Sequence, residues 1–239
     1  MKRFAQMLVV CCASVAGTAS AANEAAVGRY PVSWSAVLDL PSLADLDARL
    51  TRPFTEPVEL SRAGLVTQAA NCRDLLALRA QGYQAEGGER GYALERYEGG
   101  RCLTLSHLQT AHPARMSYLD QFRLDASALG VLPPTIATSF STLEAVAEHQ
   151  AESRGESLSR YQPGLQTRTE GDVLLVISSD VWESRVEIYA RGDFDGDALE
   201  DLLVAVNETA TQGTFESTKL LLLTRKRPRG LLQTLERLQ

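Results

Sequence analysis

This sequence has few of the features that identify common enzymes. It contains no Gly-x-Ser-x-Gly nucleophile elbow, phosphate-binding Walker loop, Rossmann glycine fingerprint or His-Glu-x-x-His zinc motif. Histidine is scarce, and the spacing of His107, His112 and His149 places no two of them at i, i+4 on one helix face. These absences argue against the familiar catalytic templates. A carboxylate pair for glycoside hydrolysis leaves no short spacing rule and stays open.

Long apolar runs are also missing. The longest one near the start, residues 7–16, has about ten residues, whereas a membrane-spanning helix needs about 20. It follows the basic residues Lys2 and Arg3 and precedes the small-x-small sequence at residues 19–21. This order predicts a secretory signal peptide cleaved after Ala21, and therefore a periplasmic or secreted protein with no membrane span. A lipoprotein signal at Cys11 or Cys12 is the alternative, but neither follows a small residue.

The charge balance limits the expected partners. The formal net charge is −6. Loss of two cations and no acid with the signal peptide makes the mature chain still more acidic. Such a chain has little non-specific attraction for nucleic acid or an anionic membrane, so we expect neither as a partner.

Cysteine is scarce in the mature chain. Cys11 and Cys12 would leave with the signal peptide, so Cys72 and Cys102 remain as one obvious pair. In an oxidising compartment such a pair predicts a disulfide. It would close a loop of about 30 residues and stabilise the fold by about 3.5 kcal/mol in the chain-entropy model. A catalytic thiol is the alternative, although neither cysteine lies in a Cys-x-x-Cys pair.

The most informative stretch is Asp193-Phe-Asp-Gly-Asp-Ala-Leu-Glu-Asp201. Asp193, Asp195, Asp197 and Asp201 stand at loop positions 1, 3, 5 and 9 between two apolar runs. Closely spaced carboxylates repel one another unless a cation neutralises them, and Ca²⁺ accepts six to eight oxygen ligands at flexible geometry. The pattern therefore predicts a calcium site, with the Leu199 backbone carbonyl at position 7 as a fifth protein ligand. An acidic solvated turn without an ion is the alternative.

The loop is not an EF-hand, which requires Gly at position 6 and Glu at position 12, where this chain has Ala198 and Val204. Residues 193–204 instead resemble the FG-GAP type calcium loop of integrin α-chain propellers and secreted bacterial proteins. That resemblance implies a loop between two β-strands, with the five ligands named above. The usual Gly is replaced by Ala198, where a positive φ would cost about 1 kcal/mol and is expected to weaken binding. A propeller needs four to eight blades, and no second Asp-x-Asp-Gly-Asp run occurs.

The pattern along the rest of the chain predicts an α+β fold. Residues 22–152 read as mainly helical, with Ser42, Asn71 and Ser141 as N-caps and one β-hairpin over residues 92–105 that the disulfide would tether. Residues 153–164 read as a linker. Residues 165–239 read as a four-stranded antiparallel meander over 172–178, 185–190, 202–206 and 219–224, closed by a C-terminal helix with Leu231, Leu232, Leu235 and Leu238 at helical spacing.

Two functions remain open from the sequence. The first is an exported, non-catalytic, calcium-binding protein that recognises or inhibits another protein, because export, a disulfide and an ion site occur without a catalytic signature. The second is a secreted hydrolase of unfamiliar type with a calcium-stabilised fold, because the chain is long enough and residues 106–140 carry no clear pattern.

Overall fold

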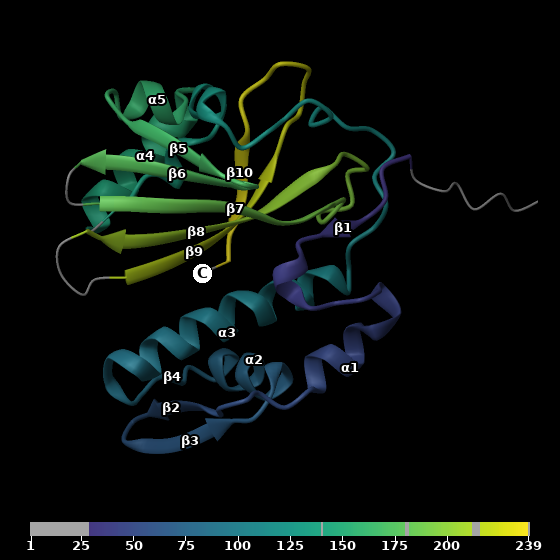
Figure 1. Ribbon diagram of the computed structural model, residues 1–239, viewed down its shortest axis with the longest axis vertical. Helices are drawn as coiled ribbons and strands as arrows, with labels where there is room; N and C mark the ends of the chain where they lie inside the picture. The colour runs from purple at the N-terminus through teal and green to yellow at the C-terminus, as the bar shows by residue number, and fades with distance from the viewer. Residues whose placement is uncertain (1–28, 140, 180–181, 212–215, 239) are drawn as a thin grey trace, which may run out of the picture.

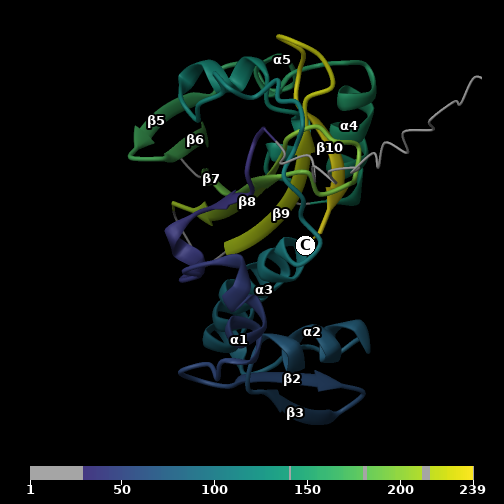
Figure 2. The ribbon, with the colours of Figure 1, turned by 90° about the vertical axis from the view of Figure 1, so that its right-hand side faces the viewer.

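The computed structural model describes residues 29–139, 141–179, 182–211 and 216–238. The predicted signal peptide lies outside these residues. Two β-layers are stacked with helices between them, a large sheet above and a smaller N-terminal unit below (Figures 1 and 2). Helix α3 (Gly88–Leu108) runs between the layers and is buried along the side that carries Cys102, Leu105 and Leu108.

The large sheet is antiparallel throughout, in the order β10-β9-β8-β7-β6-β5, with β1 also paired to β7. Its strands are β1 (Ser33–Trp34), β5 (Gln166–Glu170), β6 (Val173–Ser179), β7 (Trp182–Gly192), β8 (Asp201–Ala210), β9 (Glu216–Thr224) and β10 (Gln233–Arg237).

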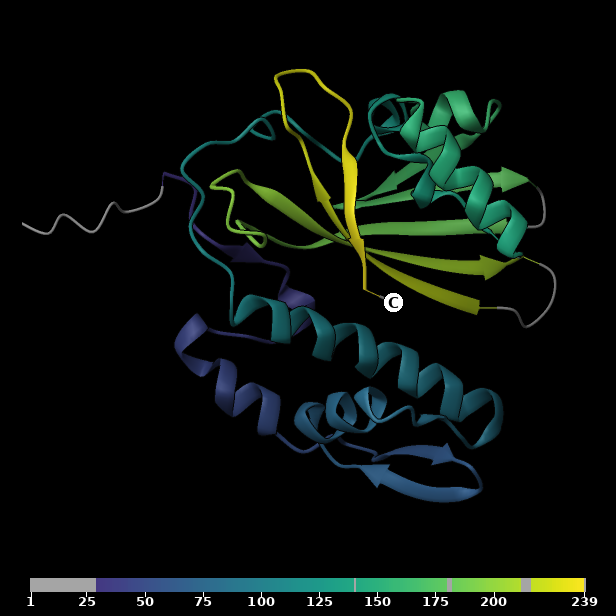
Figure 3. The ribbon, with the colours of Figure 1, turned by 180° about the vertical axis from the view of Figure 1, so that it is seen from behind.

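Both faces of this sheet are covered. On β8, Leu203 and Ala205 belong to a core shared with α3 and the N-terminal unit, whereas Leu202 and Val204 belong to a second core on the opposite face. Alternate side chains of a strand point to opposite faces, so a strand covered on both sides is apolar at nearly every position. The second core is closed by η3 (Ala126–Gly130), η4 (Pro134–Ile136) and α5 (Leu158–Tyr161), while α4 (Thr142–Ser153) lies beside them (Figure 3).

The N-terminal unit contains a three-stranded sheet in the order β3-β2-β4, with α1 (Leu46–Thr51) and α2 (Cys72–Ala80) beside it. Its strands are β2 (Val58–Arg62), β3 (Leu65–Ala69) and β4 (Gln84–Ala85), and short 3-10 helices η1 (Ala36–Leu38) and η2 (Leu43–Asp45) precede α1. The β2–β3 hairpin turns at Ala63 and Gly64, which both have positive φ, at 51° and 81°. This pair of left-handed residues matches the twist of a tight hairpin.

The predicted fold class is wrong. The N-terminal part is not mainly helical with one hairpin at residues 92–105, because those residues form the middle of α3 and the hairpin lies at β2–β3 instead. Gly99 and Gly100 suggested a turn, yet they lie in the buried part of the helix. A Cβ on Gly99 would meet the end of the Arg79 side chain of α2 at 2.6 Å, and a Cβ on Gly100 would meet nothing within 4 Å, so neither glycine marks a turn.

The four-stranded meander is also wrong as a description of the C-terminal part. The four predicted strands are present as β6 to β9, but β5, β10 and β1 extend the sheet. The predicted C-terminal helix is strand β10, which pairs with β9. In this position Leu232 enters the core on one face, whereas Leu235 and Leu238 pack against the core on the other.

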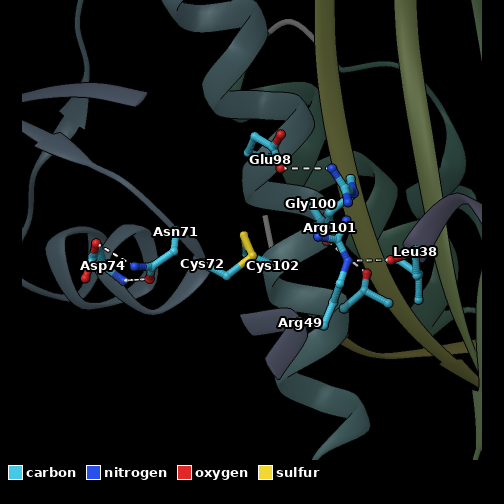
Figure 4. Close-up of a disulfide and its surroundings, with 10 residues drawn as sticks. Leu38, Arg49, Asn71, Cys72, Asp74, Glu98, Gly100, Arg101 and Cys102 are labelled. Carbon is cyan, nitrogen blue, oxygen red and sulfur yellow. Dashed lines mark hydrogen bonds and ion pairs between the residues drawn. A yellow bond between two sulfur atoms is a disulfide. The ribbon is translucent and has the colours of Figure 1, made fainter. Parts of the chain in front are cut away.

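Several local predictions are confirmed. Asn71 caps α2 by accepting a hydrogen bond from the Asp74 amide at 3.0 Å, and Ser141 caps α4 by accepting one from Glu144 at 3.2 Å. Cys72 and Cys102 form the predicted disulfide, but it joins α2 to α3 and not to a hairpin (Figure 4). The linker predicted at residues 153–164, between the two regions of the chain, stays a prediction. Helix α5 lies within that segment, and its Leu158 is fully buried.

Candidate metal centre

The candidate centre is the loop between β7 and β8, the two central strands of the large sheet (Figure 1). Ligand oxygens of Asp193, Asp195 and Asp197 all lie within 4.8 Å of one another. Calcium–oxygen bonds are about 2.3–2.6 Å, so two oxygens on opposite sides of one ion are about 5 Å apart. The three carboxylates therefore fit around a single cation. In the part of the chain that the structure describes, this is the one such group of three.

The loop is shaped by hydrogen bonds from its own backbone to its carboxylates. Asp193 accepts from the amides of Gly196 and Ala198, at 2.7 and 3.0 Å. Asp195 accepts from Asp197, and Asp197 accepts from Leu199, at 3.0 and 2.8 Å. Each acid thus accepts a hydrogen bond from an amide two to five residues further along the chain, and these bonds hold the turns of the loop. A carboxylate offers about four lone-pair sites, so each acid keeps capacity for an ion.

Two loop residues adopt left-handed backbone angles. Gly196 has φ of 83°, as its lack of a Cβ allows. Ala198 has φ of 69°, which confirms the expectation that this position demands a conformation unfavourable for alanine.

Asp201, the first residue of β8, is fully buried at 0 % exposure. Its Oδ2 accepts a hydrogen bond from the Phe194 amide at 3.1 Å, whereas its Oδ1 has no hydrogen-bond partner among the described residues. Burial raises the pKa of Asp201 to about 6, and the nearby charges of Asp195 and Asp197 act in the same direction. Asp201 is not in the group of three carboxylates, and the Thr224 hydroxyl lies close enough to lower its pKa, so a hydroxyl donor or a cation could satisfy its buried Oδ1.

The loop is also hydrogen-bonded to the backbone of residues 112–116. His112 and Asp193 exchange two backbone hydrogen bonds of 2.9 Å, and the Ala198 carbonyl accepts from Arg115 and Met116 at 3.0 and 3.2 Å. The Glu200 amide donates to the Met116 carbonyl at 2.9 Å, which completes a parallel bridge between Met116 and Leu199. Neither hydrogen bond of that bridge uses the Leu199 carbonyl, the fifth ligand predicted from the sequence.

Sequence reasoning missed a buried ionic cluster between α4, β8 and β9. Lys219, Glu148 and Glu208 are 1 %, 2 % and 1 % exposed. The Lys219 Nζ lies 3.0 Å from Glu208 Oε1 and 4.0 Å from Glu148 Oε1, and it donates a hydrogen bond to the Ala137 carbonyl. Burial raises the pKa of Glu148 to about 7, although the charge of Lys219 opposes this. The sequence offered one sign of this cluster: Lys219 begins the apolar run Lys219-Leu-Leu-Leu-Leu-Thr224, in which a lysine is expected to be buried and paired with an acid.

Comparison of this chain with protein-family models, curated proteins and solved structures found no match. Among the described residues, no helix is both long enough and apolar enough to cross a membrane.

Proposed function

We propose that the β7–β8 loop binds Ca²⁺ through the side chains of Asp193, Asp195, Asp197 and Asp201 and the Leu199 carbonyl. The observation that carries this proposal is the convergence of three carboxylates within 4.8 Å in a loop whose fourth acid is buried with an unpaired oxygen. A donor set made only of oxygen suits a hard cation, and flexible loop geometry suits calcium better than magnesium, which demands a near-ideal octahedron.

The protein is proposed to act outside the cytoplasm, in the periplasm or after secretion. The Cys72–Cys102 disulfide supports this location, because such bonds persist in oxidising compartments. Calcium loops of millimolar to submillimolar affinity also suit extracellular ion concentrations.

The proposed task is non-catalytic recognition of another protein, with the ion and the disulfide stiffening the scaffold. Strand β3 supports it, because β3 forms one end of its sheet and carries no charged side chain. Leu65 and Val66 on this strand are 68 % and 61 % exposed. An uncharged edge strand with exposed apolar residues is suited to pairing with a strand of a partner.

A secreted hydrolase remains the alternative proposal. It requires an acid or base that a substrate can reach. The buried carboxylates Glu148 and Glu208 are paired with Lys219 and shielded from solvent, so this pair does not favour it.

The calcium site is tested by isothermal titration calorimetry and thermal unfolding of residues 22–239 in CaCl₂ and in EDTA. At ten times the dissociation constant, the ion adds about 1.4 kcal/mol, which raises the melting temperature by about 3–6 °C. The double variant Asp195→Asn, Asp197→Asn keeps the oxygens that accept the loop hydrogen bonds but loses two charges. It should lose the calcium shift, whereas the control Asp45→Asn, Asp47→Asn should keep it. Equal curves for all proteins with and without calcium would refute the site.

Protein recognition is tested by affinity capture from the exported proteins of the source organism, followed by mass spectrometry. A partner recovered by the unchanged protein should be lost with Leu65→Lys, Val66→Lys. It should be retained with Leu143→Lys, which alters another apolar side chain, 82 % exposed, on α4. Capture that both charge variants reduce equally would argue against β3 as the contact surface.

A further inference from the structure

Strand β3 is an edge of the smaller sheet, and it lies at the end of the molecule opposite the large sheet (Figures 1 and 3). Edge strands present unpaired backbone groups, and folded proteins protect them with charged residues, proline, bulges or a very short length. Strand β3 has none of these protections. Its sequence Leu65-Val-Thr-Gln-Ala69 contains no charge and no proline, and its pairing with β2 has no register shift.

The other edges of the two sheets are protected. In the large sheet, edge strand β5 carries Arg168 and Glu170, and edge strand β10 carries Glu236 and Arg237. In the smaller sheet, edge strand β4 has two residues. Strand β3 is therefore the edge at which another strand can be added with the least interference.

The hydrogen bonds of β2 show which backbone groups of β3 are free. The Glu59 carbonyl accepts from the Glu86 amide at 3.0 Å, on the β4 side of β2. Glu59 lies opposite Gln68, so these two residues form a non-hydrogen-bonded pair and Gln68 points its N–H and C=O to the free edge. Val66, two residues earlier, points its groups the same way. In the described part of the chain, neither backbone is bonded to a residue outside the β2–β3 ladder.

These free groups fit a second copy of β3 related by a twofold axis at Thr67. Val66 of one copy then exchanges two backbone hydrogen bonds with Gln68 of the second copy. The symmetry repeats this pair, because a twofold interface uses the same surface on both molecules. Two such pairs give four hydrogen bonds, which satisfy every free backbone group of the two residues.

The neighbouring symmetric registers make fewer bonds. An axis at Gln68 would pair Val66 with Ala70, but the Ala70 carbonyl already accepts from Phe54 at 2.8 Å and its amide donates to Asp74 at 3.3 Å. An axis at Val66 would place the β2–β3 turn opposite Gln68. A shift by one residue would set free groups against groups that are bonded to β2. The register centred on Thr67 is thus the favoured one.

This register also brings the exposed apolar side chains of β3 together with neighbours. Leu65, Thr67 and Ala69 point to the face that the helices cover, because Thr67 and Ala69 pair with buried residues of β2. Leu65, 68 % exposed, would lie opposite Ala69 of the second copy, and Thr67 would lie opposite its own copy. Val66, 61 % exposed, would lie opposite Gln68 on the other face. Such cross-strand pairs stabilise a sheet.

Charge favours this edge as a contact between two copies. Each chain has a net charge of −6, so two copies repel one another at most surfaces. Strand β3 has no charge, and the nearest charged residues of its ladder are Glu59 and Arg62 of β2. Strand β2 and its copy would be three strand spacings apart, about 14 Å, which exceeds the screening length of about 8 Å at physiological ionic strength.

We propose that β3 pairs antiparallel with β3 of a second copy of this chain, around a twofold axis at Thr67, and joins two three-stranded sheets into one. The proposal rests on the recognition role proposed for β3 and names its partner. The contact is small, and interfaces below about 1,200 Å² are typical of transient complexes. We therefore expect a dissociation constant on the order of 10–100 µM.

Sedimentation velocity of residues 22–239 from about 1 to 500 µM should show a change from monomer to dimer. Val66→Pro removes an N–H that faces the free edge, where an edge strand tolerates proline, so the pairing with β2 is kept. It should weaken the dimer about 10-fold or more, because symmetry removes two hydrogen bonds. Leu143→Lys, on α4, is the control and should dimerise as the unchanged protein does. Thermal unfolding verifies that each variant is folded.

Disulfide trapping tests the register by a second measurement. Two Thr67 residues in a non-hydrogen-bonded pair have Cα atoms about 4.5 Å apart, within the range of a disulfide. Gln68 and its copy would be diagonal neighbours at about 7–8 Å, which is too far. Under mild oxidation, Thr67→Cys should form a covalent dimer at least about 10-fold faster than Gln68→Cys on non-reducing gels. Cys72 and Cys102 are already bonded to each other.

Three results would overturn the proposal. These are a sedimentation coefficient that stays constant up to about 500 µM, a dimer that Val66→Pro leaves unchanged, or equal trapping rates for the two cysteine variants. Capture of exported proteins tests recognition separately. A monomer that still captures a partner through β3 would remove self-pairing alone, and a dimer that captures no other protein would remove recognition of a different protein alone.

Discussion

Replacing Ala198 by glycine tests whether the β7–β8 loop stores backbone strain. Ala198 has φ of 69°, in the left-handed region where a Cβ costs about 1–2 kcal/mol. Glycine removes that cost but loses about 0.4–1 kcal/mol through the greater freedom of the unfolded chain. We therefore expect Ala198→Gly to raise the free energy of unfolding by about 0.5–1 kcal/mol. In thermal unfolding this is a rise of about 1–4 °C.

The hydrogen bonds around Ala198 extend this prediction to calcium affinity. Its amide donates to Asp193 and its carbonyl accepts from Arg115 and Met116, so protein contacts hold the strained conformation. The strain is then present with and without the ion. The stability gain should appear in both CaCl₂ and EDTA, while the calcium dissociation constant changes by no more than about 3-fold, equivalent to about 0.65 kcal/mol.

Ala63 provides the matched control, because it also has a positive φ, of 51°, but lies in the β2–β3 turn. Ala63→Gly should give a similar stability gain and no change in calcium binding. A loss of stability in Ala198→Gly beside a gain in Ala63→Gly would refute the strain argument. A gain confined to CaCl₂ would show that the ion, and not the protein, imposes the conformation.

Three further predictions concern the disulfide and the buried ionic cluster. Removal of the disulfide by Cys72→Ala, Cys102→Ala should lower the free energy of unfolding by about 3.5 kcal/mol, measured in urea without reductant, and a loss below about 1 kcal/mol would contradict the chain-entropy argument. Lys219→Met should cost about 3–5 kcal/mol in the same assay because it leaves two buried acids without their cation, and adding Glu208→Gln should restore part of it. Folding raises the pKa of Glu148 from 4.5 to about 7, so its contribution to stability is full below pH 4.5 and is lost as pH rises to about 7. Over this range the free energy of unfolding should fall by about 2–3 kcal/mol more in the unchanged protein than in Glu148→Gln. Glu89→Gln, an exposed acid of α3, is the control, and equal pH slopes in all three proteins would show that Glu148 does not titrate differently on folding.

The sequence predicts local features of this molecule better than its architecture. Asn71 and Ser141 cap their helices by bonding to amides three residues away, and the loop acids bond to amides two to five residues away. Short sequence patterns are therefore sufficient to predict these features. Cys72 and Cys102 were predictable because few alternatives remained once the signal peptide was set aside.

The errors lie where tertiary packing decides the local structure. Gly99 and Gly100 are typical of turns, but they lie in the buried part of α3, beside the Cys102, Leu105 and Leu108 side chains that pack into the core. Leu235 and Leu238 fit helical spacing, yet the free edge of β9 pairs with this segment as a strand. The free edge of β3 leaves no sequence pattern, because it exists only where β4 pairs with β2 and leaves β3 at the end of the sheet.

The contact between the β7–β8 loop and residues 112–116 has a consequence for the route of the chain. After α3 leaves the N-terminal unit, the backbone passes this loop before it reaches the second core at Leu119. The amides of His112, Arg115 and Met116 are bonded to loop carbonyls, so they exchange with solvent only when the loop opens. An ion that holds the loop closed would therefore also protect the crossing between the two layers, and proteolytic cleavage near Met116 would report on loop opening at a distance from the carboxylates.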